Sequence, residues 1–475
     1  MRSQSQSRTG RVCAAAVAVL GSIGAAGYGQ QQEDGKGGAP PSEDAAWRQQ
    51  VERRMQALEQ ENASLRKQIG KVADTQQAVL NDAASRGLTL SPRPRRTTPP
   101  AFDTLKYVAE GDFPGSIAIP GTNISIQVGG FVQLDAIYDN NVIGSEDSFI
   151  VSSIPTIGET AGHTSFSVRQ SRIFVKTEAP TDWGPLVTYL EGDFFGPDGT
   201  DFRLRHAYGQ IGDEHQLLAG QTWTTFMDAS VYPAIFDYQG PNAMVLVRQP
   251  MVRYTQKVGE DLQWQIALED PEPDLSTEAP LTGAETAAIP DLAGNVRWSP
   301  SWGHLQLAGI LRQLTFDPAV GSRSNELGWG LNLSGQVLLF EPVAKGKQDN
   351  IVFQVAGGQG IAIYFNDTSG LGLDGFVNAG GDLDALGILG GFVSYQHYWH
   401  EKWASSGGYS YLQVDNTSDQ GGDTYKAGHY AVLNLMYYPV ERIWMGLELL
   451  YGIREDEDGN TGDDARLSFS VQYRF

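Results

Sequence analysis

The chain ends with residues 465–475, ARLSFSVQYRF, in which apolar and polar side chains alternate without a break. One face carries Leu467, Phe469, Val471, Tyr473 and Phe475. Successive side chains of a β-strand point to opposite sides of the sheet. The segment therefore predicts a strand with one face in an apolar medium and the other in water.

The same alternation recurs from about residue 117 to the C-terminus. Clear examples are GTNISIQVGGFVQLDAIYD (121–139), ELGWGLNLSGQVLLF (326–340) and HYAVLNLMYYPVERIWMGLELLYG (429–452). Polar, acidic connections such as REDEDGNTGDD (454–464) separate the runs. Aromatic residues gather near the strand ends. The interfacial girdles of an outer-membrane barrel require such a distribution, whereas a soluble sandwich or propeller does not.

We therefore predict an all-β fold in which residues 113–475 form a transmembrane antiparallel β-barrel of about 16 strands, at roughly 22 residues per strand and connection. A barrel of this size leaves an aqueous channel. Because hydrocarbon tolerates no open sheet edge, the last strand should close on the first strand near Ile124–Leu134. Arg466 and Arg474 lie near the two ends of the last strand, and we expect them to be rim charges.

The N-terminus predicts export. Residues 1–29 combine three arginines with the short apolar run VCAAAVAVLGSIGAA and then small residues, as a secretory signal peptide does. The one cysteine of the chain, Cys13, lies inside this segment. The mature chain is therefore expected to contain no disulfide, no thiol nucleophile and no cysteine-based metal site.

Three further segments precede the predicted barrel. Residues 30–46 are rich in Gln, Gly and Pro, a composition typical of disorder. Residues 47–82 repeat apolar positions at alternating spacings of four and three, which predicts an α-helical coiled coil in the periplasm; the alternative is a single amphipathic helix packed on a domain. Residues 83–112 form a Pro-rich linker. The heptads alone do not decide between a dimer and a trimer.

The formal net charge of −22 argues against nucleic acid as a partner. Several of the few cationic residues nevertheless fall on the predicted inner wall, opposite the apolar face. They are Arg172, Lys176, Arg203, Arg205, Arg253 and Arg312. In DFRLRHAYGQ (201–210) the alternation places Arg203, Arg205, Ala207 and Gly209 on one face and Tyr208 on the other.

A set of cations on neighbouring strands of a narrow pore raises the local concentration of anions. We therefore interpret these six residues as pore-lining and selective for anions. The alternative is that they pair with inner-wall carboxylates and only hold the wall together. Glu178, Glu191, Asp193 and Glu448 are available for such pairs.

The connection LLAGQTWTTFMDASVYPAIFDYQGPNAM (217–244) is too apolar and aromatic for a free surface loop. We expect it to fold into the barrel and narrow the channel; packing against a neighbouring subunit is the alternative.

Enzyme signals are weak. The sequence lacks HExxH, GxSxG and Walker motifs. His397 and His400 could form a metal pair, but they stand among aromatic residues typical of a girdle. We predict no catalytic residue, no cofactor and no metal site.

Six segments in order resemble the DcaP-like outer-membrane porins. They are GSIAIPGTNISIQVGGFVQLDAIYD (115–139), RQSRIFVKTEAPTDWG (169–184), LEGDFFG (190–196), FRLRHAYGQ (202–210), AGQTWTTFMD (219–228) and VRQPMVRYT (247–255). The resemblance implies a homotrimer of 16-stranded barrels, an N-terminal periplasmic coiled coil and uptake of small anions such as dicarboxylates. The basic constriction of the family would correspond to Arg172, Lys176, Arg203, Arg205 and Arg253.

The expected function is that of an outer-membrane porin, a passive diffusion channel for small hydrophilic solutes that is biased to anions. Its expected partners are the lipid bilayer, two further copies of the chain and small anionic solutes, with peptidoglycan as a further candidate. One alternative is a sugar-specific porin, which would need stacked aromatic residues in the lumen. Another is a closed structural barrel that tethers the outer membrane to the cell wall. A barrel enzyme is the least favoured interpretation.

Overall fold

A computed structural model describes residues 109–141, 143–158, 161–278 and 281–475. The predicted signal peptide, disordered segment and coiled coil lie outside the described residues, as does the predicted linker up to residue 108. The last linker residues belong with the barrel, since the main chain of Glu110 forms a β-bridge with Ile117.

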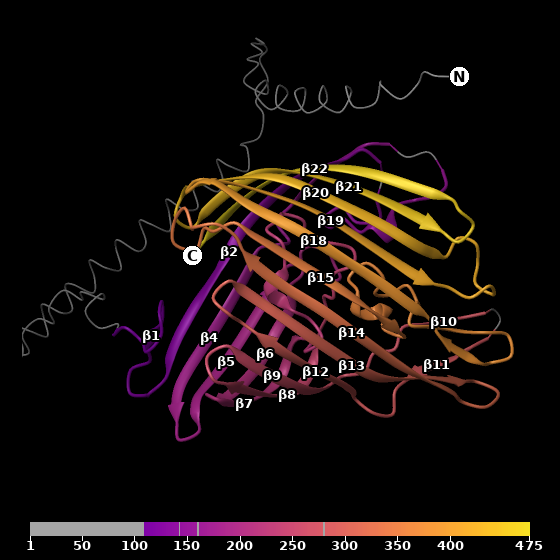
Figure 1. Ribbon diagram of the computed structural model, residues 1–475, viewed down its shortest axis with the longest axis horizontal. Helices are drawn as coiled ribbons and strands as arrows, with labels where there is room; N and C mark the ends of the chain where they lie inside the picture. Colours follow the sequence, from indigo (N-terminus) through magenta and orange to yellow (C-terminus); the bar gives the residue numbers. More distant parts are fainter. Residues whose placement is uncertain (1–108, 142, 159–160, 279–280) are drawn as a thin grey trace, which may run out of the picture. The chain divides into compact units, whose positions relative to one another are not determined.

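Sixteen antiparallel strands close into a barrel in the described part of the chain (Figure 1). They are β2 (Ser125–Asp139), β4 (Arg172–Thr181), β5 (Gly184–Asp193), β6 (Arg203–Gly212), β7 (His215–Trp223), β8 (Arg248–Val258), β9 (Leu262–Glu269), β12 (Asp291–Trp298), β13 (Gly303–Pro318), β14 (Ser324–Leu338), β15 (Asn350–Gln359), β18 (Gly387–His400), β19 (Trp403–Asp415), β20 (Tyr425–Val440), β21 (Ile443–Asp456) and β22 (Thr461–Arg474). The prediction of about 16 strands is confirmed.

Shorter elements complete the sheet and its loops. β1 (Ile117–Ala118), β3 (His163–Ser167) and β11 (Gly283–Thr286) pair with strands of the barrel. A separate three-stranded sheet consists of β10 (Leu275–Thr277), β16 (Gly375–Val377) and β17 (Leu383–Ala385). The 3-10 helices are η2 (Val151–Ser153), η3 (Ala229–Val231) and η4 (Ala362–Tyr364). No helix among the described residues is long and apolar enough to cross a membrane.

The barrel closes where the last strand meets the first. Residues 466–474 of β22 pair with residues 131–139 of β2, and the Phe475 amide donates to the Gly130 carbonyl at 3.1 Å. The predicted partner strand is confirmed, although the contact begins at residue 131 instead of 124. The first half of β2 pairs with β4 instead, and β3 continues the position of β4 along the second half.

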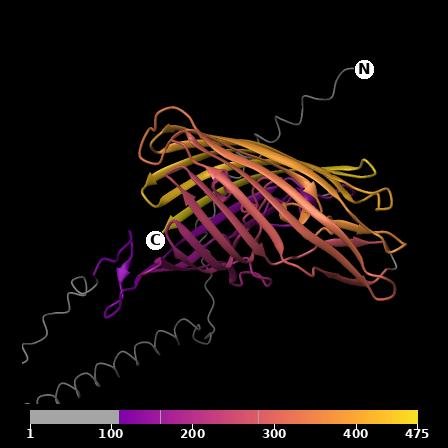
Figure 2. The same ribbon diagram turned by 60° about the horizontal axis from the view of Figure 1, so that its bottom comes forward.

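The two ends of the barrel differ. Short turns such as residues 182–183, 213–214 and 441–442 lie at the end that holds the C-terminus, and the longer connections other than residues 339–349 lie at the other end (Figure 2). Outer-membrane barrels have short periplasmic turns and long extracellular loops. We number the long-end loops in chain order, so that L1 is 140–162, L3 is 224–247, L4 is 270–290, L6 is 360–386 and L7 is 416–424.

The wall is apolar outside and polar inside. Leu190, Val252, Leu307 and Leu389 are exposed on the outer face. Inner-wall groups such as Asn332, Gln354 and Ser410 are buried under loops. This is the reverse of a soluble protein, and the outer face suits lipid tails.

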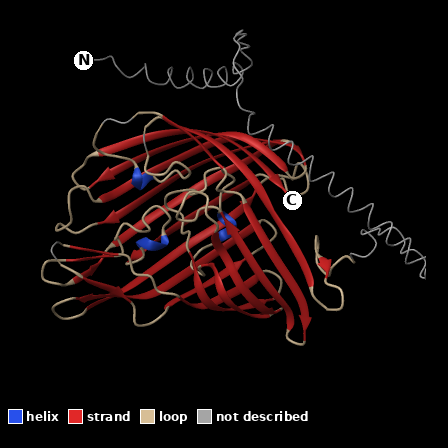
Figure 3. Ribbon diagram, turned by 180° about the vertical axis from the view of Figure 1, so that it is seen from behind, coloured by secondary structure: helices blue, strands red, loops and turns tan. Residues whose placement is uncertain are grey.

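Loops L3 and L6 fold into the barrel, as the loops and short helices inside the ring of strands in Figure 3 show. Phe226 and Val231 of L3 and Phe365 of L6 are fully buried in one core with the inner wall. Asn332 of β14 donates to the Phe226 carbonyl at 2.8 Å. A glycine at position 330 permits this approach, since a Cβ there would lie 2.6 Å from Ile361 and 3.1 Å from Phe226. The predicted inward fold of the 217–244 segment is confirmed for the loop residues 224–244, whereas residues 217–223 belong to strand β7.

Arg466 is not a rim charge. Its side chain is 2% exposed, and its Nε donates to Asp139 at 2.6 Å across the β2–β22 seam. The guanidinium also lies 5.4 Å from the ring of Phe149, which L1 brings inside the barrel. The expectation failed because L1 covers the inner wall at this point.

We predict that Arg466→Met lowers the stability of the barrel by about 3–5 kcal/mol, because it leaves the Asp139 carboxylate buried without its partner. Urea unfolding in detergent micelles measures this loss. Arg466→Met combined with Asp139→Asn should lose clearly less than the single variant. Additive losses from the two substitutions would show that the pair does not couple the seam.

Candidate functional site

Five arginines lie on the inner wall of β4 to β8. Arg172 begins β4, Arg203 and Arg205 lie in β6, and Arg248 and Arg253 lie in β8. L3, which connects β7 to β8, passes in front of this wall. The sequence therefore brings cations from three strands to one level of the lumen, and we call these five residues the arginine cluster.

Two carboxylates of β5 neutralise part of the arginine cluster. Arg203 forms a bidentate pair with Asp193, with N–O distances of 3.0 and 2.8 Å. Arg205 donates to Glu191 and to Asp193, at 2.7 Å each. Its side chain is only 3% exposed. Arg205 is therefore largely a structural member, as the alternative interpretation of these cations supposed.

Tyr238 ties L3 to this paired group. Its hydroxyl accepts from Arg203 and from Arg205, the latter at 2.9 Å. Its ring stacks on Phe195, with the centroids 4.0 Å apart. Tyr238 thereby holds L3 against the charged wall.

The remaining three arginines are poorly paired. Arg172 Nη1 lies 3.9 Å from Glu191. Arg248 lies over the ring of Trp223 at 4.9 Å, and Arg253 donates to the Trp223 carbonyl at 3.4 Å. Arg172 Nε, Arg248 Nη1 and Arg253 Nε are buried with no hydrogen-bond partner among the described residues. Five arginines against Glu191 and Asp193 leave three positive charges without a direct partner.

Arg248 was missed because strict alternation does not hold at a strand end. Position 248 has the parity of Val252, which is exposed on the outer wall. The chain enters β8 from L3, however, and the side chain of Arg248 turns inward onto Trp223. The sequence did hold one signal for an inward-facing Arg248, because this cation closely follows the segment that was predicted to fold into the barrel.

A bulge in β6 changes the face of the residues that follow it. Glu191 pairs with His206 and Gly192 with Leu204, so Arg205 is the extra residue. The inner face therefore continues with Tyr208, and the prediction that placed Ala207 and Gly209 inside is wrong. A bulge shifts the alternation by one residue.

The bulge completes a row of aromatic rings in the lumen. Tyr189 stacks with Phe174 at a centroid distance of 5.6 Å and packs beside Tyr208 at 5.7 Å. The expectation that aromatic residues lie mainly at the rims is therefore incomplete. This row lies on β4, β5 and β6, on the side of the arginine cluster nearer the short turns.

Two of the predicted pore residues stand apart from the arginine cluster. Lys176 lies on the inner face, but it pairs with Glu178 at 3.4 Å and lies 4.2 Å from the ring of Phe113. Arg312, contrary to the prediction, does not line the lumen, because its side chain is 0% exposed. It pairs with Asp291 at 3.2 Å and with Asp374 of L6 at 2.7 Å. L6 covers it, which the sequence pattern of β13 could not reveal.

L3 is anchored to the opposite wall by Asp228. This carboxylate meets Arg297 at 2.8 Å, His304 at 2.7 Å and the Ser334 hydroxyl at 3.0 Å. Burial alone would raise the pKa of Asp228, but the hydrogen bond from His304 and the Arg297 charge outweigh it and lower the pKa to about 2. The anchor is therefore ionised at all but strongly acidic pH.

Asp367 joins L6 to L1. It accepts from the Ser152 amide at 3.1 Å, and the Ser152 hydroxyl donates to its carbonyl at 2.6 Å. Burial raises the pKa of Asp367 to about 7, against the opposing effects of the Ser152 amide and Arg454. The contact between the two loops is thus built on a carboxyl group that is close to neutral.

His397 has a partner other than a metal. Its Nδ1 lies 2.6 Å from Asp349, and its ring packs edge-on against Trp399. Within the described ranges, no group of three or more His, Cys, Asp or Glu residues is placed to hold a metal ion.

The sequence model of the family described as "DcaP outer membrane protein" matches residues 109–475. The outer membrane channel DcaP of Acinetobacter baumannii aligns with a TM-score of 0.65 at 19% identity, over 74% of this chain and 98% of that chain. An anion-selective porin from Comamonas acidovorans aligns with a TM-score of 0.51 at 10% identity, over 74% of this chain and 100% of that chain. At these identities the likeness shows the fold. No curated protein matches the chain.

We predict that Asp228→Asn loosens L3, because Arg297 and His304 lose their charged partner. Removing one member of a buried pair costs about 3–5 kcal/mol. Single-channel recordings should show a larger and noisier conductance than those of the unchanged protein. Because the pKa of Asp228 is depressed, the anchor contributes fully above its unfolded pKa of 3.8 and is lost as pH falls through about 2.

Unchanged conductance and noise in Asp228→Asn would show that the other contacts of L3 suffice to hold it. Asp213→Asn, in an exposed short turn, is the matched control.

We predict that Asp367→Asn removes a pH-dependent loss of stability. The folded pKa of Asp367 is raised, so its contribution is complete below the unfolded pKa of 3.8 and is lost as pH rises through about 7. The free energy of unfolding of the unchanged protein, relative to Asp367→Asn, should therefore fall by a few kcal/mol between about pH 5 and about pH 9. A difference that stays constant with pH would contradict this assignment.

Proposed function

The chain belongs to the DcaP outer membrane protein family, and from that premise we propose that it is a passive diffusion channel biased to small anions such as dicarboxylates. The fold is that of an outer-membrane porin. Solutes would move down their gradient through each barrel, and the chain's own side chains would set which solutes pass easily.

The observation that carries the proposal is the set of unpartnered guanidinium groups. Arg172, Arg248 and Arg253 each have a buried N–H that meets no acceptor among the described residues. Buried donors in proteins normally have partners. A carboxylate of a passing solute can supply the missing acceptor through charge-assisted hydrogen bonds.

The paired arginines support these three. Glu191 and Asp193 hold Arg205 in place, and Tyr238 accepts a hydrogen bond from Arg205 and so holds L3 against the same wall. The uncompensated charges therefore face a lumen narrowed by protein, where charge attracts anions more strongly than in open water. Because the donors are fixed before the solute arrives, little conformational entropy is lost when it passes.

A sugar-specific porin is the second candidate, since the row of Phe174, Tyr189 and Tyr208 provides the stacked lumenal rings that such a channel needs. The row and the arginine cluster lie next to each other. A solute that combines a ring with a carboxylate would use both, so the two candidates differ in which surface dominates.

We further propose a homotrimer of barrels with the coiled coil of residues 47–82 in the periplasm, after removal of residues 1–29. Residues 30–46 and the linker 83–112 would be the flexible connections. In the alternative role, a tether to peptidoglycan, the barrel would carry no current. Conductance steps in a planar bilayer separate the two roles, and the mass of the detergent-solubilised protein tests the trimer.

We predict that the channel is anion-selective and that Arg248→Gln weakens this preference. Reversal potentials across a bilayer in asymmetric potassium chloride measure it. Removing one of three uncompensated charges should reduce the logarithm of the anion-to-cation permeability ratio by about a third. Arg172→Gln should act similarly. Arg203→Ala with Arg205→Ala should also weaken the preference, but it disturbs the wall as well.

The matched control is Lys176→Gln, which removes a charge that Glu178 already compensates. Cation selectivity of the unchanged protein would overturn the anion bias and leave a general porin. Equal effects of Arg248→Gln and Lys176→Gln would show that the pore residues are wrongly assigned.

A further inference from the structure

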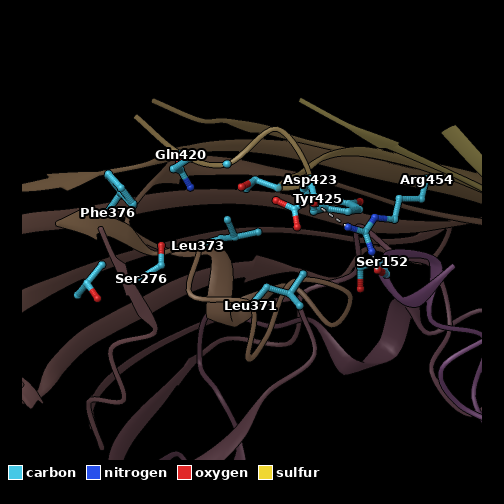
Figure 4. A pocket seen from close by; sticks show the side chains of 12 residues that line it. Ser152, Ser276, Leu371, Leu373, Phe376, Gln420, Asp423, Tyr425 and Arg454 are labelled. Atoms are coloured by element: carbon cyan, nitrogen blue, oxygen red, sulfur yellow. Dashed lines mark hydrogen bonds between the residues drawn. The ribbon is translucent and has the colours of Figure 1, made fainter. Parts of the chain in front are cut away.

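A second cavity lies away from the arginine cluster, at the end of the barrel with the long loops. Four loops and two strands build it. The lining residues are Ser152 of L1, Ser276 and Thr277 of L4, Leu371, Leu373 and Phe376 of L6, Gln420, Gly421, Asp423 and Thr424 of L7, Tyr425 of β20 and Arg454 of β21. Its volume is about 360 Å³. In Figure 4, Ser276 and Leu373 lie on one side of the space, Arg454 and Ser152 on the other.

Two sets of hydrogen bonds fix the walls of the cavity. Next to the lining residue Leu373, the Asp374 carboxylate accepts from the Ile363 amide at 2.9 Å and from Arg312 at 2.7 Å. Arg454 donates to the Ser152 carbonyl at 2.5 Å and to the Asp423 carbonyl at 3.1 Å, and so joins L1 to L7. The loops that surround the cavity are thus tied together before any ligand enters.

The polar groups of the lining are free to bind. Within the described chain, the hydroxyls of Ser276, Thr277 and Thr424 and the carboxylate of Asp423 take part in no hydrogen bond with protein. Ser276, Thr277 and Thr424 are half-buried and Asp423 is exposed at the rim, so the lining offers three hydroxyls and one carboxylate to a partner with several hydroxyl groups.

Charge and shape exclude other ligand classes. The lining holds one carboxylate, Asp423, and one guanidinium, Arg454, which Asp456 already neutralises at 2.7 Å. A free anion therefore finds no uncompensated positive charge there, and the single carboxylate of Asp423 is too few ligands for a metal cation. A purely apolar ligand would leave the lining hydroxyls without water or partner. One apolar wall, which includes Leu373 and Phe376, can nevertheless cover the less polar face of a ring.

The size of the cavity fits one small ring. At about 30 Å³ per water molecule, it holds about a dozen waters. A hexose has about as many non-hydrogen atoms. Ligand cavities in proteins start at about 300 Å³.

We propose that this cavity, formed by L1, L4, L6 and L7, binds a neutral sugar ring at the outer mouth of the barrel, with Asp423 and Thr277 as hydrogen-bonding residues and Phe376 against the ring face. The sugar comes either from a free solute or from the glycan of a surface lipopolysaccharide. The site does not depend on the anion bias of the channel, because its lining shares no residue with the arginine cluster.

Saturation-transfer NMR tests the proposal with the full-length protein in detergent micelles and with D-glucose or D-galactose as probes. Transfer to the ring protons is expected with the unchanged protein. Loss of one charge-assisted hydrogen bond in Asp423→Asn should weaken binding by about tenfold. Thr277→Val should also weaken it. Asp419→Asn, on the same loop but outside the cavity, is the matched control and should bind normally.

A second measurement distinguishes the two sources of sugar. Free hexose added to the long-loop side of a bilayer should reduce the channel current if the ligand is a solute. If the ligand is a surface glycan, a lipopolysaccharide core oligosaccharide should bind while free hexose leaves the current unchanged. The reversal potential of Asp423→Asn should equal that of the unchanged channel in either case. Absence of binding by both probes, or equal binding by Asp423→Asn and Asp419→Asn, overturns the proposal.

Discussion

The requirement that every main-chain N–H and C=O find a partner without water governs this molecule. A sheet meets it in hydrocarbon only when its first and last strands pair, as β2 and β22 do. Closure then forces each strand to present one face to lipid and one to the lumen. The exposed leucines and valines of the outer wall and the serines, asparagines and glutamines of the inner wall follow from this single constraint.

The same constraint creates a second packing problem inside the barrel. A ring of 16 strands encloses more space than its own inner side chains fill. L3 and L6 enter this space with apolar residues such as Phe226 and Phe365. Because the inner wall is polar, its side chains hold the loops by hydrogen bonds, as Asn332 does to the Phe226 carbonyl and Ser334 does to the Asp228 carboxylate. Protein therefore fills part of the lumen, and the charged wall of β4 to β8 faces the part that the loops leave open to solvent.

Sequence alternation predicted most of the fold, since period-two patterns are independent of what the loops do. The strand number and the closing strand followed from it, and the apolar, aromatic composition of the 217–244 segment predicted the inward loop. Alternation failed where local geometry breaks the period: at the bulge around Arg205, which turns Tyr208 inward, and at the strand end that turns Arg248 inward. It also carries no information on which inner residues a loop will cover, so Arg312 and Arg466 were assigned to water although both are buried.

These failures share a physical origin that bears on function. Arg205 and Arg312 each pair with two carboxylates and Arg466 pairs with one, and each of the three holds two segments of chain together. Arg172, Arg248 and Arg253 have a buried N–H without an acceptor, as Arg312 also does, but among the described residues the one carboxylate pair that any of the three forms is the 3.9 Å contact of Arg172 with Glu191. Breaking a buried ion pair costs several kcal/mol, so Arg205, Arg312 and Arg466 cannot leave their carboxylates to bind a solute. An arginine in a barrel lumen is therefore informative about transport only when no carboxylate of the protein pairs with it closely. By that criterion fewer residues form the transport surface than the number of inner-wall cations suggests. This surface centres on Trp223 and the start of β8, where Arg248 lies.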